Sequence, residues 1–167
     1  MQFVVKLFSF LLILFFISAC GFKPMLAKDN NNYKILDEIK ISKVNGPNNL
    51  KLERILKESL NLSYTNSPIY SLEVTVGFEN TSMAILKDSQ TTRYRVKVIL
   101  NYNLKEINTQ KIIDSGNLYL YSSYDVSASD FMNYISEKYV SENGLIELAE
   151  ELKNRLILVI STRRNEQ

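Results

Sequence analysis

An apolar run opens the chain and ends close to its single cysteine. The run extends from Phe3 to Ile17 and is interrupted by Lys6 and Ser9. Its apolar core is shorter than the ~20 residues that a helix needs to cross the hydrocarbon layer of a membrane. A short apolar run behind a positively charged start is typical of a cleaved export signal. We therefore expect residues 1–19 to be removed.

Polar residues rich in asparagine follow this run and then give way to alternation. Residues 20–34 have the composition of a short tether. Beyond them, Ile35, Ile39 and Ile41 alternate with Leu36, Glu38, Lys40 and Ser42, which predicts a strand with one buried face. We expect the folded domain to begin at residue 35.

Helical spacing replaces alternation after a turn at residues 45–48. The apolar positions of this segment are Leu52, Ile55, Leu56 and Leu60. This spacing places them on one side of a helix, with Asn48 or Asn49 available to cap its start and Asn61 beyond its end.

Alternation returns over the middle of the chain. The apolar positions are Tyr70, Leu72, Val74, Val76 and Phe78 in one segment and Tyr94, Val96, Val98, Leu100, Tyr102 and Leu104 in the next. A period of two predicts two strands. A turn at residues 107–110 and a return segment through 118–121 predict a long hairpin. Both faces of the return segment are partly apolar, as expected of a central paired strand or of a strand with a covered face.

A second helical stripe ends the chain. Its apolar positions are Leu145, Leu148, Ala149, Leu152, Leu156, Val159 and Ile160. Residues 127–130 supply capping groups at its start, and Gly144 inside it predicts a bend or a break. The element order predicts an α+β two-layer sandwich, with two α-helices packed on one face of a mixed, about four-stranded β-sheet. We expect one domain over residues 35–161 and a C-terminal tail over 162–167.

Composition favours binding rather than catalysis. Removing 19 of the 167 residues leaves 148, enough for one domain with a buried core. Lys6 is the one charged residue that is lost, so 19 basic and 18 acidic residues remain, and no strong field favours nucleic acid.

The inventory of reactive side chains points the same way. The chain has no histidine, no tryptophan and one cysteine, and its five glycines are scattered. This excludes a zinc cluster, a histidine-dependent nucleophile, haem ligation and a glycine-rich phosphate loop. We expect no enzyme activity, no catalytic residue, no cofactor and no metal.

The single cysteine, Cys20, follows Ile17, Ser18 and Ala19 and precedes Gly21. This arrangement is similar to a bacterial lipobox, where the thiol receives a diacylglycerol and the signal is cut off before it. The alternative is an ordinary free cysteine. Among lipoproteins, a glycine after the cysteine favours the outer membrane. We expect acyl chains on Cys20 to anchor the protein there.

Three short segments carry a resemblance to a known family. They are Cys20-Gly21-Phe22-Lys23-Pro24, Gln90-Thr91-Thr92-Arg93-Tyr94 and Ala149-Glu150-Glu151-Leu152. Together with the lipobox and the order of elements, they resemble LptE, the lipopolysaccharide-assembly lipoprotein family of the Gram-negative outer membrane, in its alphaproteobacterial form. The resemblance runs from Cys20 to about Ser161.

The resemblance implies a function. Members of that family sit as a plug inside the lumen of the outer-membrane barrel protein LptD, support its assembly and bind lipopolysaccharide. Two alternatives stay open: a lipoprotein accessory subunit of the general barrel-assembly machinery, and a lipid-anchored hydrolase that uses carboxylates such as Glu147, Glu150 and Glu151. No motif pairs these three carboxylates, so they fit a solvated helix face.

Basic residues are the candidates for lipopolysaccharide binding. Lys87 precedes Gln90-Thr91, at the position where the family's basic residue is linked to the glycolipid, and could meet a phosphate as a mobile charge. Arg93, Arg95 and Lys97 alternate along one strand and so project from one face. For all four residues the alternative is an ordinary solvated surface charge.

Tyrosines form a second set of candidates. Tyr119, Tyr121 and Tyr124 could anchor a protein interface, where tyrosine is enriched, or could pack against the sheet.

Overall fold

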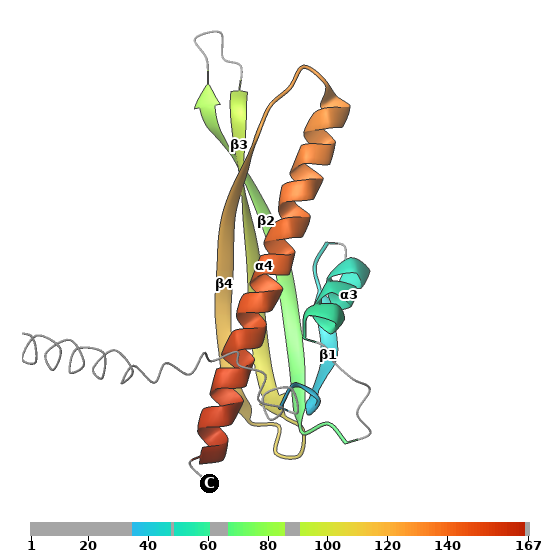
Figure 1. The fold of residues 1–167 in the computed structure, drawn as a ribbon, viewed down its shortest axis with the longest axis vertical. Helices are drawn as coiled ribbons and strands as arrows, with labels where there is room; N and C mark the ends of the chain where they lie inside the picture. The colour runs from blue at the N-terminus through green and yellow to red at the C-terminus, as the bar shows by residue number, and fades with distance from the viewer. Residues whose placement is uncertain (1–34, 48, 61–66, 86–90, 166–167) are drawn as a thin grey trace, which may run out of the picture.

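The computed structural model describes residues 35–47, 49–60, 67–85 and 91–165. The elements are β1 (Ile39–Asn45), α3 (Asn49–Ser59), β2 (Tyr70–Ile85), β3 (Thr91–Glu106), β4 (Ile112–Asp125) and α4 (Asp130–Asn165). The sheet has the order β1-β2-β3-β4; β1 pairs with β2 in parallel, and the other two pairs are antiparallel. Both helices lie on one side of the sheet (Figure 1). The expected α+β sandwich is confirmed.

The core lies between the helices and one face of the sheet. Alternate residues of β2 and β3 supply its floor, because a strand sends every second side chain to the same face. The side chains of the core that are fully buried include Leu72, Val96, Val98, Leu100 and Leu104 from the strands and Leu52, Leu56, Leu152, Leu156 and Ile160 from the helices. Each such side chain contributes about 1.5–3 kcal/mol relative to exposure.

The start of the fold differs from the expected strand. Ile35 and Leu36 are helical and buried, and β1 begins only at Ile39. The backbone turns between them, where the Glu38 N–H donates to the Ile35 carbonyl at 3.3 Å. Tyr70 then donates its N–H to the Glu38 carbonyl at 3.0 Å, which sets the register of β1 on β2.

The first helix follows the predicted spacing, with Leu52, Ile55 and Leu56 buried. At its start, the Leu50 N–H donates to the side-chain oxygen of Asn49 at 2.8 Å. The other two asparagines considered for its ends, Asn48 and Asn61, lie outside the described residues.

The last helix, α4, is helical without a break across Gly144, so of the two possibilities named there, a bend or a break, the break is wrong. It also continues to Asn165, past the expected domain boundary at Ser161. Gly144 is buried against the sheet, where the helix backbone passes close to Val98 of β3. Among the described residues, no helix is long and apolar enough to span a membrane.

Strand β4 is an edge strand, with β3 as its neighbour, and not a central strand. Its partly apolar character comes from the covered face, because α4 packs on one side of it. Of the two explanations for its composition, the covered face is therefore the correct one.

Candidate interaction surface

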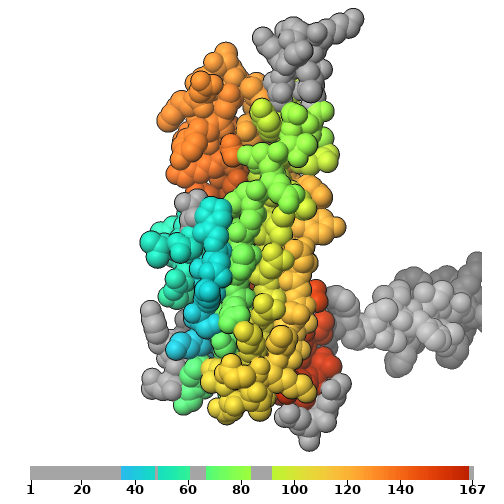
Figure 2. Space-filling model, turned by 180° about the vertical axis from the view of Figure 1, so that it is seen from behind, coloured from blue at the N-terminus to red at the C-terminus, as the bar shows by residue number. Residues whose placement is uncertain are grey.

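The face of the sheet that points away from both helices is called the open face below. Figure 2 looks onto it and shows the strands side by side without a covering helix. Arg93, Arg95 and Lys97 of β3 alternate with the buried Val96 and Val98 and so lie on this face. Tyr119 and Tyr121 take alternate positions of β4, and Lys97 lies opposite Tyr121 in the register. The alternation that predicted a common face for the three cations is therefore correct.

Two of the three cations have carboxylate partners on neighbouring strands. Arg93 Nε lies 2.7 Å from Asp125 Oδ1, and Lys97 Nζ lies 3.1 Å from Glu79 Oε2. The hydrogen bond and charge of Arg93 lower the pKa of Asp125, and the hydrogen bond with Glu79 raises the pKa of Lys97. Because these groups are solvated, the pairs fix side-chain positions more than they stabilise the fold.

Arg95 differs from its two neighbours. Its guanidinium lies 5.4 Å from the centre of the Tyr121 ring, and within the described part of the chain no carboxylate pairs with it. A guanidinium over an aromatic face keeps its N–H groups available at the edges of its plane. Of these three cations, Arg95 is therefore the one best able to meet an external anion.

The tyrosines divide between the two faces. Tyr119 and Tyr121 are 57% and 53% exposed, and their rings meet edge to face at 5.7 Å. Lys97 lies 5.8 Å from the centre of the Tyr119 ring. These contacts build a ladder of aromatic and cationic side chains.

Tyr124 belongs to the helix side, because its spacing from Tyr121 is odd. Its ring stacks on Tyr94 at 5.7 Å, and its hydroxyl donates to Glu137 of α4 at 3.4 Å. Burial, and then the charge of Glu137, raise the pKa of Tyr124. The three tyrosines considered from the sequence therefore form no single surface.

The remaining candidates lie on α4 or outside the described residues. Cys20 and Lys87 lie outside the described residues. Glu147 and Glu151 are exposed on α4, and Glu150 forms an ion pair with Lys153. Within the described ranges, no three histidine, cysteine or acidic side chains come together in a group that could hold a metal ion.

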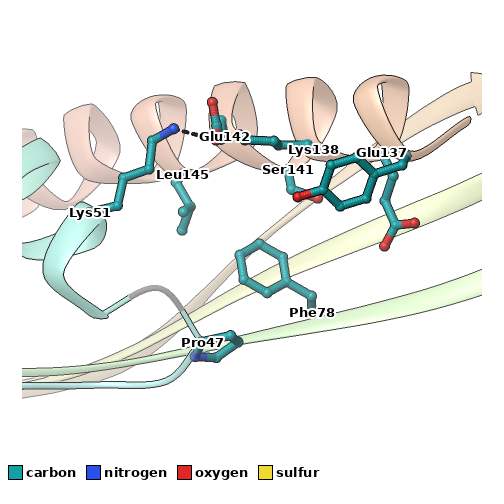
Figure 3. A pocket seen from close by; sticks show the side chains of 9 residues that line it. Pro47, Lys51, Phe78, Glu137, Lys138, Ser141, Glu142 and Leu145 are labelled. Atoms are coloured by element: carbon teal, nitrogen blue, oxygen red, sulfur yellow. Dashed lines mark ion pairs between the residues drawn. The ribbon is translucent and has the colours of Figure 1, made fainter. Parts of the chain in front are cut away.

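A cleft that was not predicted from the sequence lies between α4, the start of α3 and β2. The cleft has a volume of about 350 Å³. Figure 3 shows the side chains that line it: Pro47, Lys51, Phe78, Tyr134, Glu137, Lys138, Ser141, Glu142 and Leu145. It lies beside the part of α4 that the shorter α3 does not accompany. No spacing along the chain indicates it, because its lining comes from separate segments.

The cleft has an apolar floor and charged walls. Phe78 of β2 and Leu145 of α4 form the floor. Lys51 and Glu142 form an ion pair at one side. On the sheet side, Glu137 accepts a hydrogen bond from the side-chain amide of Asn80 at 2.6 Å. The cleft can therefore take an apolar group of a ligand, while the polar groups at its walls orient the rest of that ligand.

Comparison with solved structures places this fold among bacterial lipoproteins. A candidate lipoprotein from Caulobacter crescentus CB15 matches with a TM-score of 0.64 and 14% identity, over 80% of this chain and 97% of that one. Lipoprotein B from Nitrosomonas europaea matches with a TM-score of 0.59 and 10% identity, over 84% and 93%. Rare lipoprotein B from Shewanella oneidensis matches with a TM-score of 0.55 and 9% identity, over 75% and 96%. No protein-family model and no curated protein sequence matches the chain.

These matches cover 93–97% of each solved chain, so the likeness extends over almost the whole of each solved structure. At such low identity the likeness concerns the fold. It does not carry over a ligand or a partner.

Proposed function

We propose that this protein is a non-enzymatic outer-membrane lipoprotein, anchored through Cys20, that occupies the lumen of an LptD-type barrel, assists its assembly and binds lipopolysaccharide. The proposal joins two independent lines of support. The sequence resembles LptE from Cys20 to about Ser161, and the fold is like that of solved bacterial lipoproteins.

The observation that carries the plug proposal is the chemistry of the open face. It is polar enough to remain in water, yet its side chains are held in place by Arg93–Asp125, Lys97–Glu79 and Arg95–Tyr121 contacts. The inner wall of an outer-membrane barrel is polar. Protein interfaces that retain water rely on ordered polar groups and on tyrosine. An ordered polar sheet face suits such a wall.

Affinity purification from outer membranes tests the partner. We expect a tagged copy to bring down one large barrel protein in a stable complex. Recovery of subunits of the general barrel-assembly machinery instead would support the accessory-subunit alternative and contradict the plug. A Cys20→Ala copy should fold but fail to reach the outer membrane, and incorporation of labelled palmitate into that copy would contradict the anchor.

A binding titration tests the ligand. Lys87→Glu should weaken binding of purified lipopolysaccharide, because it reverses the charge offered to a phosphate, without lowering the melting temperature. Lys111→Glu is a matched control, since this exposed lysine lies in the turn before β4. Equal affinity of the Lys87 variant and the original protein would show that Lys87 does not contribute to lipopolysaccharide binding.

A further inference from the structure

The edge of β2 that faces β1 is paired along only part of its length. β1 pairs with β2 from Tyr70 to Thr75, whereas β2 continues to Ile85. Its opposite edge is paired with β3 throughout. From Gly77 onward, no strand among the described residues occupies the β1 side, so backbone N–H and C=O groups are left there to find partners. The segment from Gly77 to Ile85 is called the free β2 edge below.

The chain leaves the sheet sharply just before this edge begins. Gly46 has φ 122°, and a Cβ placed there would lie 2.3 Å from the Val76 carbonyl oxygen. Pro47 follows, which has no N–H to continue a ladder. β1 is therefore stopped by its own sequence, and the free β2 edge starts at a defined point.

The free β2 edge lacks the protection that the outer edge of β1 has. β1 carries Lys40, Lys43 and an irregularity between Ile41 and Lys43, all of which discourage pairing with a further strand. Between Gly77 and Ser82 the free β2 edge has no lysine, no proline and no register shift, and its one charge, Glu79, is paired with Lys97. It is a usable template for another strand.

The cleft lies directly beside this template. Phe78 belongs both to the free β2 edge and to the cleft floor, with Leu145 of α4 facing it (Figure 3). A strand added to β2 would send every second side chain toward the helix side, where the cleft could receive an apolar one. About 350 Å³ is enough for one or two such side chains.

Charge narrows the kind of strand that fits. Of the two lysines that line the cleft, Lys51 is paired with Glu142, while Lys138 is exposed and has no carboxylate partner within the part of the chain described. A ligand carboxylate next to the apolar side chain could form a surface ion pair with Lys138.

We propose that the free β2 edge and the adjoining cleft bind an extended peptide segment of a partner protein, which adds as a strand beside Gly77–Ser82, inserts an apolar side chain over Phe78 and Leu145, and places a carboxylate near Lys138. The inference is independent of the proposed lipopolysaccharide binding, because it concerns the β2 edge and the helix side of the sheet rather than the open face.

The test uses the full-length protein purified in detergent and a labelled peptide of about eight residues that alternates threonine with apolar residues and carries one phenylalanine and one glutamate. We expect saturable binding and slower hydrogen exchange at the amides of Gly77–Ser82. A copy of the peptide that is N-methylated on alternate residues should bind at least tenfold more weakly, because it cannot donate its N–H groups to β2. Absence of binding, equal binding of the N-methylated peptide, or protection at β1 or β4 instead would overturn the proposal.

Charge variants test the second contact. Lys138→Glu should weaken binding about fivefold, and a peptide with lysine in place of glutamate should recover it, while Lys111→Glu should change neither. If Lys138→Glu leaves the affinity of both peptides unchanged, the carboxylate contact is wrong. Without peptide, protection of Gly77–Ser82 from hydrogen exchange that grows with protein concentration would show that a second copy of the chain occupies the edge. That result would overturn the proposal of a different partner protein.

Discussion

The Tyr102 hydroxyl donates a hydrogen bond to Asp114 Oδ2 at 2.6 Å, and this contact joins adjacent strands under the last helix. The Tyr102 side chain is 1% exposed, and Arg155 of α4 lies 5.6 Å from its ring and 3.4 Å from Asp114. One carboxylate therefore ties together β3, β4 and α4 at the end of the molecule away from the cleft.

Removing this hydroxyl should destabilise the fold. Tyr102→Phe keeps the ring in the core but takes one donor from a half-buried carboxylate, and a hydrogen bond to a charged group contributes about 1.5–3 kcal/mol. We expect chemical denaturation to show a loss of unfolding free energy of that size. Tyr119→Phe is the matched control, because that hydroxyl belongs to an exposed side chain. Equal stability of the two variants would contradict the role given to Asp114.

The same contact predicts how stability changes at high pH. Burial, and then the hydrogen bond and charge of Asp114, raise the pKa of Tyr102 above its ordinary value. A group whose pKa is raised by folding supports the folded state below its unfolded pKa, which for tyrosine is about 10, and loses that support as the pH rises above it. The unfolding free energy should therefore fall above about pH 10, and fall less steeply in Tyr102→Phe. Parallel pH curves for the two proteins would rule this out.

The open face gives a prediction that separates its three cations. Arg93 and Lys97 are paired with Asp125 and Glu79, whereas Arg95 packs on Tyr121. If lipopolysaccharide phosphates bind here, Arg95→Gln should weaken binding about fivefold in a titration at low salt, and Arg93→Gln should do so less. Asp125→Asn should strengthen binding, because it releases Arg93. If Arg93→Gln weakened binding more than Arg95→Gln, pairing with a carboxylate would not determine which cation binds lipopolysaccharide.

The strands were predictable because their signal is local. In β2 the period of two is unbroken from Tyr70 to Phe78, and in β3 only Ile99 interrupts it between Tyr94 and Leu104, so the buried face follows from sequence alone. The segment at Ile35 was misread because the spacing of Ile35 and Ile39 suits a helical turn as well as a strand.

The cleft was not predictable for a different reason. Lys51, Phe78 and Lys138 come from three separate segments, and only the packing of α3 and α4 on the sheet brings them together. Likewise, alternation placed Arg93 and Lys97 on one face, but their partners depend on the register between strands, which spacing along one strand does not specify.

Gly144 supplies the last prediction, because its role is packing rather than flexibility. A Cβ at this position would lie 2.8 Å from Val98 Cγ2, and Val98 is fully buried in β3. Alanine is the better helix former by about 1 kcal/mol, but overpacking of a core costs about 1–3 kcal/mol. We expect Gly144→Ala to lower the melting temperature despite its helix propensity. In a Val98→Ala background the same change should become neutral or stabilising, since the added methyl then fills space rather than colliding. A Gly144→Ala effect of the same sign and size in both backgrounds would mean that Gly144 does not set the distance between α4 and β3.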